Sequence, residues 1–332
     1  MKKLIIGYSP LDGGSNSYTE SFKRILSVFG KVVKTPSLKE VVTFRMPYSY
    51  DLLIFNWSDS AFINNKTGLV DVFGVVKAFL RLFVFKTISK KVVFVRHNVY
   101  PHNTSFKSKK LATKLINIYE RFFDACWVHS GHFTENFRLY VPHPLYQLAA
   151  NEDPLFAEIN LPDKFFIVFG RIVPYKKIDK LIEALPDDVN LVVCGSCSDD
   201  AYLGKLLAHK KSNVTIIPKY ISDDLAKDMI AQSLGVVICH SDEDMIVSGS
   251  IIFAVSVGAP VIAIETPFVA WFQKNINAKM ITSVAGFPEL AESMRSFQPQ
   301  IDNADILSCQ SHFCDQSVQA KVKISLNQLG LI

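Results

Sequence analysis

The chain has 332 residues, 49% of them hydrophobic, which suits two globular domains that each bury a core. Residues 1–150 carry 21 Lys and Arg against 9 Asp and Glu, a balance of +12, whereas residues 151–332 carry 15 against 22, a balance of −7. The basic half suits an anionic partner, either a membrane surface or a lipid-linked phosphate. Nucleic acid is not expected, because base-reading and stacking motifs are missing.

The N-terminus and the cysteines indicate a cytoplasmic protein. Residues 1–7 are too short and too soon interrupted for a signal peptide and read as a buried strand. Four of the six cysteines lie in or beside apolar runs, which favours reduced thiols. Cys194 and Cys197 have C-x-x-C spacing, but no second pair stands at zinc-ligand spacing, so metal and redox chemistry are not expected.

Short apolar runs alternate with segments of helical period along the whole chain, which predicts an α/β fold with parallel sheets. Strands are predicted in the first half near residues 4–8, 31–34, 52–56, 92–96, 125–129 and 139–141. The pattern begins again at 165–169 and continues at 191–194, 214–217, 235–239 and 261–264. Two Rossmann-like domains in tandem are therefore expected, with ligands at the carboxyl ends of their strands.

A segment with four prolines, residues 141–162, is the predicted linker between these domains. We expect an N-terminal Rossmann-like domain over residues 1–145 that binds an acceptor. A C-terminal Rossmann-like domain over residues 146–300 would bind the donor, and a helical segment over residues 301–332 would pack back across the cleft between the domains. The active site is expected in that cleft.

A diphosphate pocket is predicted where two strands of the second half give way to helices. Gly170 permits close backbone approach, Arg171 offers a planar fork of donors, and Lys176 adds a point charge. Three small residues follow the predicted strand at 235–239, where a helix should begin: Ser248, Gly249 and Ser250. The N–H groups at the N-terminus of a helix bind anions. The alternative is an ordinary solvent-exposed basic loop.

Acidic residues near this pocket are candidates for binding hydroxyl groups. Asp242, Glu243 and Asp244 precede the predicted helix and can accept hydrogen bonds from a sugar. Glu265 follows the next strand and is a candidate for the nucleotide ribose. The alternative for both groups is a solvated acidic loop.

Two histidines follow a strongly apolar strand of the first half. His97 and His102 leave its carboxyl end, and imidazole suits proton transfer near neutral pH. Asn98 lies between them, and the alternative is that one histidine only holds the loop. Loops after two other strands are expected to approach the same place, with candidate residues Asp12, Gly13, Gly14, Asn16, Trp57 and Asp59.

Two segments of the basic half are candidates for membrane contact. Residues 71–86 are rich in Val, Phe and Leu and include Lys77 and Arg81, while residues 107–114 carry four lysines ahead of Tyr119, Phe122 and Phe123. The alternative is that these aromatic residues are the core faces of ordinary helices. The clustered positive charge favours peripheral membrane contact.

These motifs, in this order, resemble the bacterial glycosyltransferases of the GT-B fold. The likeness is greatest to short exopolysaccharide enzymes like the GDP-mannose-dependent β-1,4-mannosyltransferase of the xanthan pathway. It covers most of the chain, and its anchors are residues 16–18, 51–57, 97–102, 169–176, 248–250 and 258–261. The resemblance implies that Arg171 and Lys176 contact a donor diphosphate and that the histidine loop lines the acceptor side. Many relatives carry two glutamates eight positions apart, where this chain has Met245 and Phe253.

The expected function is transfer of a sugar from a nucleoside-diphosphate donor, GDP-mannose first, to a lipid-linked oligosaccharide in exopolysaccharide, capsule or O-antigen synthesis. The enzyme would be peripheral on the inner face of the cell membrane. No metal or other cofactor is expected, because two cations and a helix terminus can balance the diphosphate charge. If the enzyme inverts, the base is His97 or His102, with Asp12 and Asp59 in reserve. A sugar-nucleotide epimerase and a non-catalytic sugar-nucleotide-binding scaffold remain as alternatives.

Overall fold

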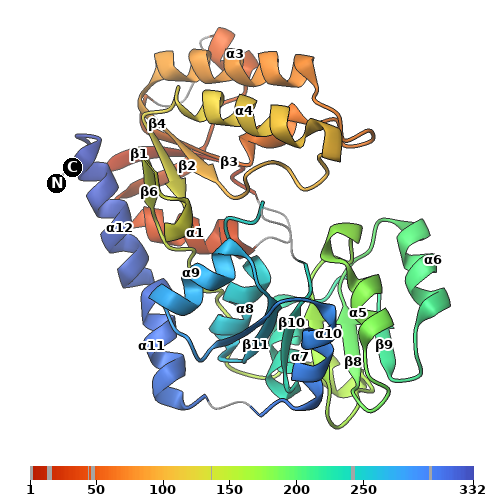
Figure 1. Ribbon diagram of the computed structural model, residues 1–332. Helices are drawn as coiled ribbons and strands as arrows, with labels where there is room; N and C mark the ends of the chain where they lie inside the picture. The colour runs from red at the N-terminus through yellow and green to blue at the C-terminus, as the bar shows by residue number, and fades with distance from the viewer. Residues whose placement is uncertain are drawn as a thin grey trace. The chain divides into compact units, whose positions relative to one another are not determined.

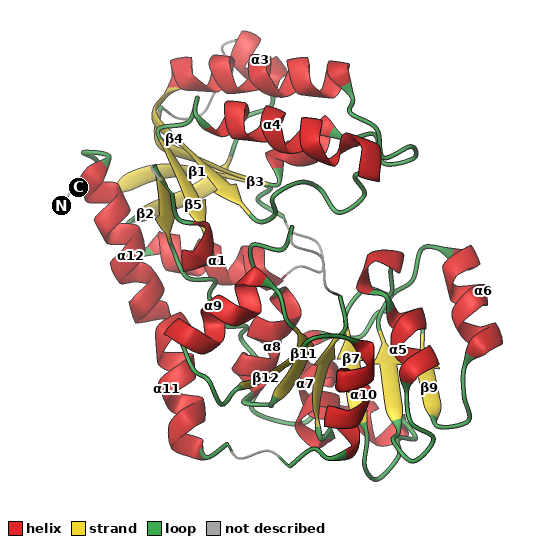
Figure 2. Ribbon diagram, viewed as in Figure 1, coloured by secondary structure: helices red, strands yellow, loops and turns green. Residues whose placement is uncertain are grey.

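The computed structural model of the chain describes residues 3–12, 17–43, 45, 49–135, 137–240, 244–298 and 301–332. The chain divides into two compact units, each built on a parallel six-stranded sheet with helices around it (Figures 1 and 2). The first unit comprises Met1–Pro144, Asp244–Val247 and Phe313–Ile332. The second comprises Leu145–Glu243 and Ser248–His312.

The sheet of the first unit has the strand order β2-β1-β3-β4-β5-β6. Its strands are β1 (Leu4–Ser9), β2 (Gly30–Lys34), β3 (Tyr50–Asn56), β4 (Ser89–Arg96), β5 (Ala125–Val128) and β6 (Arg138–Tyr140). The helices of this unit are α1 (Ser17–Ser27), α2 (Leu38–Val42), α3 (Val72–Ile88), α4 (Lys109–Glu120) and α12 (Asp315–Gln328), with 3₁₀ turns η1 (Ser58–Phe62), η2 (Phe106–Ser108) and η3 (Gly131–Phe133).

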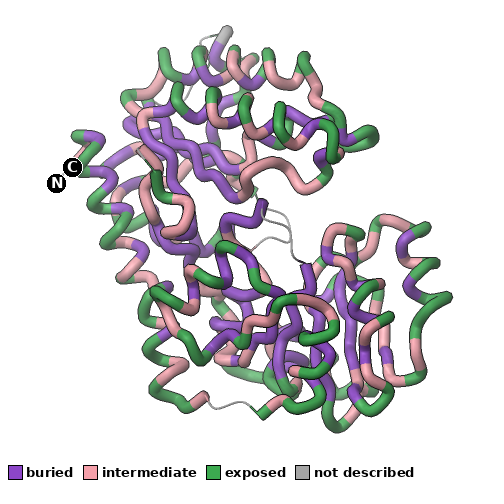
Figure 3. The backbone as a smooth tube through the Cα atoms, viewed as in Figure 1, coloured by how far each residue is buried: buried purple, intermediate pink, exposed green. Residues whose placement is uncertain are grey.

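Two hydrophobic clusters cover the two faces of this sheet. Side chains of α1 and α12 pack on one face and those of α3 and α4 on the other. Burial follows the strands, and the outer sides of the helices remain exposed (Figure 3). β3 is buried along its whole length, as expected for a central strand of a parallel sheet with helices on both faces.

Two segments of the first unit are distant in sequence from the rest of it. On α12, Val318, Val322 and Leu326 are fully buried, and the indole Nε1 of Trp127 on β5 donates a 2.8 Å hydrogen bond to the Ser325 hydroxyl. Residues 244–247 join through an isolated antiparallel bridge between Asn98 and Met245 and through a backbone bond from the Val99 N–H to the Asp244 carbonyl. Apolar burial thus assigns α12 to this unit, and backbone pairing assigns residues 244–247 to it.

The sheet of the second unit has the strand order β12-β11-β10-β7-β8-β9. Its strands are β7 (Phe166–Phe169), β8 (Leu191–Cys194), β9 (Val214–Ile217), β10 (Gly235–Ile238), β11 (Val261–Ile264) and β12 (Ile281–Val284). Its helices are α5 (Ile178–Ala184), α6 (Asp200–His209), α7 (Asp223–Gln232), α8 (Gly249–Val257), α9 (Pro267–Asn275), α10 (Phe287–Arg295) and α11 (Asn303–Phe313), with 3₁₀ turns η4 (Pro154–Glu158) and η5 (Pro174–Lys176).

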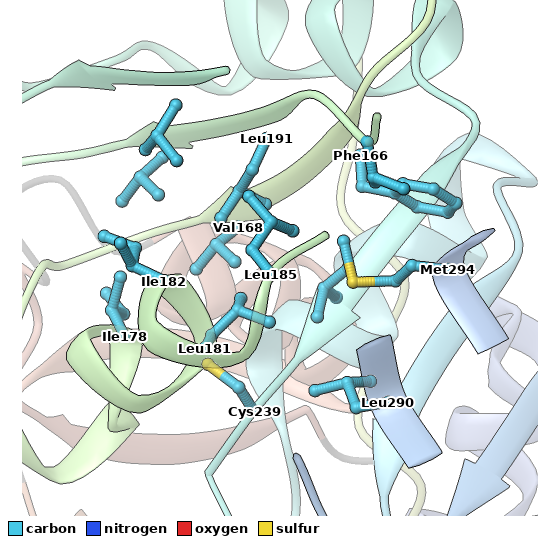
Figure 4. Packing of buried hydrophobic residues seen from close by; sticks show 14 of the residues in the cluster. Phe166, Val168, Ile178, Leu181, Ile182, Leu185, Leu191, Cys239, Leu290 and Met294 are labelled. Carbon is cyan, nitrogen blue, oxygen red and sulfur yellow. The ribbon is translucent and has the colours of Figure 1, made fainter. Parts of the chain in front are cut away.

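The core on one face of this sheet is built by α5, α6 and α10. Figure 4 shows Leu181, Leu185 and Leu290 packed against Phe166 and Val168 of β7, with all five residues buried. The eleven strands predicted from the sequence are present, and β12 is an additional strand that the sequence pattern did not reveal. All six cysteines are free thiols.

Candidate functional site

Both sheets have a point where the strand order reverses direction. In the first unit this point lies between β1 and β3, and in the second it lies between β7 and β10. Loops that leave the carboxyl ends of strands on either side of such a point diverge, and the space between them is where open α/β sheets bind ligands. These loops begin after Ser9 and Asn56 in the first unit and after Phe169 and Ile238 in the second.

In the second unit, Gly170, Lys176 and Ser250 surround the end of β7. The Lys176 ammonium donates to the Phe169 carbonyl over 3.1 Å, and the Ser250 hydroxyl donates to the same carbonyl over 3.3 Å. Gly170 has φ +100°, and a Cβ there would lie 3.0 Å from Lys176 Nζ and 3.7 Å from Ser250 Oγ. The bare backbone of Gly170 is thus flanked by an ammonium and a hydroxyl, the donors that an oxyanion requires.

Lys176 is 7% exposed although it carries a charge. Burial, together with the charge of the neighbouring Arg171, lowers the pKa of its ammonium to about 8, while the nearby Cys239 opposes the shift. Arg171 itself is exposed. A bound anion would relieve the repulsion between the two cations, so the electrostatics of this loop favour a negatively charged ligand.

The predicted helix start beside this loop is confirmed. α8 begins at Gly249, and the Ser248 side chain caps it by accepting from the Ile251 N–H over 3.3 Å. Because the first-turn N–H groups of a helix have no partner within it, the N-terminus of α8 adds dipolar positive charge beside Ser250.

The structure describes only some of the remaining candidate residues. Glu265 follows β11, is exposed, and uses its backbone N–H to bond the Val284 carbonyl. Glu243 and its neighbour Asp242 lie outside the described residues, as do Gly13, Gly14 and Asn16 of the first unit. Asp12 of the first unit is exposed.

In the first unit, His97 is held in a buried aromatic cluster with Asn56, Tyr18 and Trp57. Its Nε2 lies 3.1 Å from the Asn56 Oδ1, and the Asn56 Nδ2 donates to the Ser9 carbonyl, which fixes the orientation of that amide. The oxygen therefore faces His97, whose Nε2 must carry the proton. The Trp57 ring stacks on His97 at 4.5 Å and 17°.

Trp57 has a left-handed backbone conformation, with φ 50°. This conformation is a strained one for a bulky side chain, and strained residues cluster at functional sites. The strain is sustained because Trp57 is bracketed by His97 on its face and by the Tyr18 ring, 5.7 Å away, at its edge.

Two further histidines, His129 and His143, complete the cluster. The Tyr18 hydroxyl lies 2.8 Å from His129 Nε2, and the His129 Nδ1 lies 2.7 Å from the Val141 carbonyl. Burial lowers the pKa of His97 well below its usual value, with a smaller contribution from its histidine neighbours. It lowers the pKa of His129 to about 4 and that of His143 to about 3. All three imidazoles are therefore neutral at pH 7.

His102 has a different environment. Its Nδ1 lies 3.5 Å from the Oδ2 of Asp244, and its side chain is 28% exposed, whereas that of Asp244 is 5% exposed. A carboxylate at one ring nitrogen orients an imidazole. His102 and Asp244 therefore form a histidine–carboxylate pair.

The loop between the two histidines is anchored by Arg96, which is fully buried. Its guanidinium donates to the carbonyls of Asn98 and Val99 and pairs with Glu120 over 2.8 Å. Asp59, in η1, is also buried, and this burial raises the pKa of its carboxyl to about 6, against the opposing charge of Arg96.

Sequence reasoning missed the roles of several residues in these clusters. His129 follows β5 as His97 follows β4, so the rule that identified His97 also applied to it. The partnership of Asp244 with His102 joins positions 142 residues apart and gives no local signal, since His102 stands at 102 and Asp244 at 244.

Comparison with known proteins bears on these sites. Residues 151–292 match the family described as "Glycosyl transferases group 1". The matched segment is thus similar to the domains of that family. It contains Gly170, Arg171, Lys176 and the whole of α8. No curated protein sequence matches the chain.

Solved structures of similar fold cover almost the entire chain. Alr3699/HepE of Anabaena, in complex with UDP-glucose, is 13% identical, with a TM-score of 0.64 and coverage of 98% of this chain and 99% of that chain. The protein described as "Trehalose-6-phosphate from E. coli bound with UDP-2-fluoro glucose" is 9% identical, with a TM-score of 0.67 and coverage of 100% and 99%. AviGT4, a glycosyltransferase involved in avilamycin A biosynthesis, is 11% identical, with a TM-score of 0.58 and coverage of 98% of each chain.

At these identities the likeness concerns the fold. Two units with parallel six-stranded sheets, matched over nearly full length to these structures, confirm the α/β GT-B fold that the sequence predicted.

Proposed function

We propose that this chain transfers one sugar from a nucleoside-diphosphate donor to a lipid-linked oligosaccharide, with the donor bound by the second unit and the acceptor by the first. The observation that carries the proposal is the cluster of Gly170, Lys176 and Ser250 beside the N-terminus of α8. HepE binds UDP and UDP-glucose, and the E. coli protein binds UDP-2-fluoro glucose, which supports a sugar nucleotide here as well.

The donor side would stabilise the leaving group. When the bond between the anomeric carbon and the phosphate oxygen breaks, negative charge grows on that oxygen. The Lys176 ammonium, the Arg171 guanidinium and the first-turn N–H groups of α8 are preorganised donors for such charge. These groups supply positive charge at the diphosphate, and we therefore propose that transfer requires no metal ion.

The acceptor side needs a base if transfer inverts the anomeric carbon, and we favour His102. Its Nδ1 lies 3.5 Å from the Asp244 carboxylate, which would balance the imidazolium formed when His102 accepts the proton of the attacking hydroxyl. His97 is less suited, because its Nε2 is protonated and faces Asn56. His97, Asp12 and Asp59 remain the alternatives.

The donor and the pathway follow from the resemblance and from the charge of the chain. GDP-mannose is the first candidate donor, from the resemblance to the xanthan-pathway enzyme, and UDP-sugars are the second, from the ligands of the structural neighbours. The excess of +12 in residues 1–150 supports work at the inner face of the cell membrane on an acceptor of exopolysaccharide, capsule or O-antigen synthesis.

Donor binding tests the phosphate roles directly. GDP-mannose and UDP-glucose are titrated calorimetrically into wild type, Arg171→Ala and Lys176→Ala, with Lys180→Ala as a matched control on the exposed side of α5. Loss of a charge-assisted contact weakens binding about 10- to 150-fold. Unchanged affinity in both test variants would refute the pocket, while an equal loss in Lys180→Ala would indicate a nonspecific charge effect.

Product analysis separates the proposed reaction from its two alternatives. The protein is incubated with the donor, with and without a bacterial lipid extract. Transfer predicts sugar incorporation into lipid only when the extract is present. Conversion of the donor sugar without lipid would identify an epimerase, and tight binding with no consumption under either condition would identify a scaffold.

A further inference from the structure

The outer surface of α3 and α4 carries an unusual amount of exposed apolar side chain. On α3, Val72, Val76, Leu80 and Phe83 follow one another at intervals of three and four residues and are 48% to 68% exposed. Such spacing places them on one face of a helix. Phe73 beside them is 88% exposed. Isolated surface apolar residues are ordinary, but a continuous stripe of this kind marks a contact surface.

The stripe continues onto α4, which lies beside α3 (Figure 1). Phe83 of α3 and Phe122, just after α4, meet edge to face at 5.6 Å, and Phe122 is 40% exposed. Ile118 on the last turn of α4 and Phe106 in η2 extend the exposed apolar area, with Phe106 at 88% exposure. The apolar surface therefore spans both helices.

Positive charge lies beside this apolar surface, and part of it is uncompensated. Residues 72–119 contain ten Lys and Arg and no Asp or Glu, and four of the ten pair with acidic residues outside this range: Lys86, Lys90, Lys91 and Arg96. An open hollow of about 900 Å³ on α4 is lined by Phe106 and Ile118 together with five cations: Lys107, Lys109, Lys110, Lys114 and Arg121. Within the described residues, no ion pair forms at Lys107, Lys110, Lys114, Arg121 or Lys77, the last of which is exposed on α3.

Apolar side chains flanked by uncompensated cations match the interface of an anionic bilayer, where the first enter the acyl boundary and the second meet phosphate groups. A second copy of the chain would bring the same cations face to face, so self-association is disfavoured. None of the described helices is long and apolar enough to cross a membrane. We propose that the α3–α4 surface docks the chain on anionic phospholipid, lying on the bilayer rather than spanning it.

The purpose of docking rests on the proposed function, because docking would bring the acceptor-binding unit to a lipid-linked substrate. Docking itself requires neither donor nor acceptor. It can therefore be measured on the full chain by flotation with vesicles of phosphatidylcholine alone or of phosphatidylcholine with phosphatidylglycerol, while donor titration follows the sugar-nucleotide site separately.

Two variants separate the contribution of positive charge to vesicle binding from that of apolar contact. Lys107→Ala/Lys110→Ala/Lys114→Ala removes three cations, and the control Lys180→Ala/Lys210→Ala/Lys219→Ala removes three exposed lysines of the second unit. Phe73→Gln/Leu80→Gln removes the apolar contact, and the control Leu207→Gln/Leu307→Gln changes side chains of the second unit that are 49% and 66% exposed.

We expect binding to the phosphatidylglycerol vesicles that weakens with salt and is at least tenfold poorer on phosphatidylcholine alone. The lysine variant should lose about fivefold in vesicle affinity for each cation removed, and the Phe73/Leu80 variant should lose at least tenfold, with both controls near wild type. The absence of wild-type binding to anionic vesicles would overturn the proposal, as would equal losses in test and control variants. Retained donor affinity in both test variants would show that the donor site is independent of docking.

Discussion

Replacing Gly170 by alanine should weaken donor binding without unfolding the second unit. The residue has φ +100°, which L side chains rarely adopt, so the substitution should cost roughly 1–2 kcal/mol of stability. The added methyl carbon would lie 3.0 Å from Lys176 Nζ. That atom is the end of a flexible side chain and can move aside at little further cost to the fold.

The larger effect should fall on the ligand. The methyl group fills the space between Lys176 Nζ and Ser250 Oγ, which is where we place a phosphate oxygen. A lost hydrogen bond to a charged group costs about 1.5–3 kcal/mol, which corresponds to a 10- to 150-fold increase in donor Kd. Isothermal titration with GDP-mannose and UDP-glucose measures this change, and chemical denaturation measures the stability loss.

Gly258→Ala is the matched control. Gly258 ends α8 with φ +81°, and a Cβ there would meet Ile306 Cγ2 at 3.1 Å. This substitution carries a comparable backbone cost at the opposite end of the same helix, so stability should fall while donor Kd stays unchanged. If Gly170→Ala binds donor as wild type does, or if both variants lose affinity equally, the placement of the phosphate is wrong.

Four other outcomes follow from the structure. Because the pKa of Lys176 in the free protein is about 8, donor affinity measured by calorimetry should be constant below pH 8 and fall about tenfold per pH unit above it, and Lys176→Arg should abolish that fall. Asp244→Asn should lower kcat at least a hundredfold, measured with saturating donor, through loss of orientation of His102, while donor Kd remains unchanged. Burial raises the pKa of Asp59 to about 6, so the folded state binds its proton more tightly than the unfolded chain does, and the loss of stability grows as pH rises from about 4 to 6. Asp59→Asn should therefore raise the free energy of unfolding at pH 7 by about 3 kcal/mol in urea titrations. Leu326→Ala should cost about 3 kcal/mol in the same titrations and leave donor affinity unchanged, because that side chain is fully buried in the first unit.

The fold was predictable where its signals are local. Each buried strand predicted from an apolar run is present, because central parallel strands have apolar residues on both faces. β12 was not predicted because it is an edge strand and because Thr282 and Ser283 interrupt its apolar residues. The partner of α12 could not be predicted: Trp127 lies 198 residues from Ser325, and no local pattern encodes such a contact.

The same distinction separates the candidate residues of the two units. Gly170 and Lys176 stand within one strand–loop segment, and Ser248–Ser250 stand at one helix start, so each part could be predicted from a short stretch of sequence. The histidine cluster joins Tyr18 to His129 across 111 residues. Its assembly depends on the strand order β1-β3-β4-β5, which the succession of strands along the chain does not determine.

The two positions where related enzymes carry glutamates show how this site has been rebuilt. Phe253 is 2% exposed, and its ring lies 4.8 Å from Phe169 and 5.0 Å from Tyr146. Phe253 therefore packs against Phe169, whose carbonyl accepts hydrogen bonds from both Lys176 and Ser250. Met245, 3% exposed, is bridged to Asn98 in the first unit.

Both positions have thus become packing positions. Restoring a carboxylate by Phe253→Glu would place a charge among aromatic rings, and an unpaired buried charge costs several kcal/mol. Phe253→Glu alone is therefore expected to destabilise the protein rather than to restore the glutamate that relatives carry. If the chain binds a donor as we propose, its affinity should depend chiefly on the diphosphate contacts, since these two positions hold apolar residues in place of carboxylates that would bind hydroxyl groups.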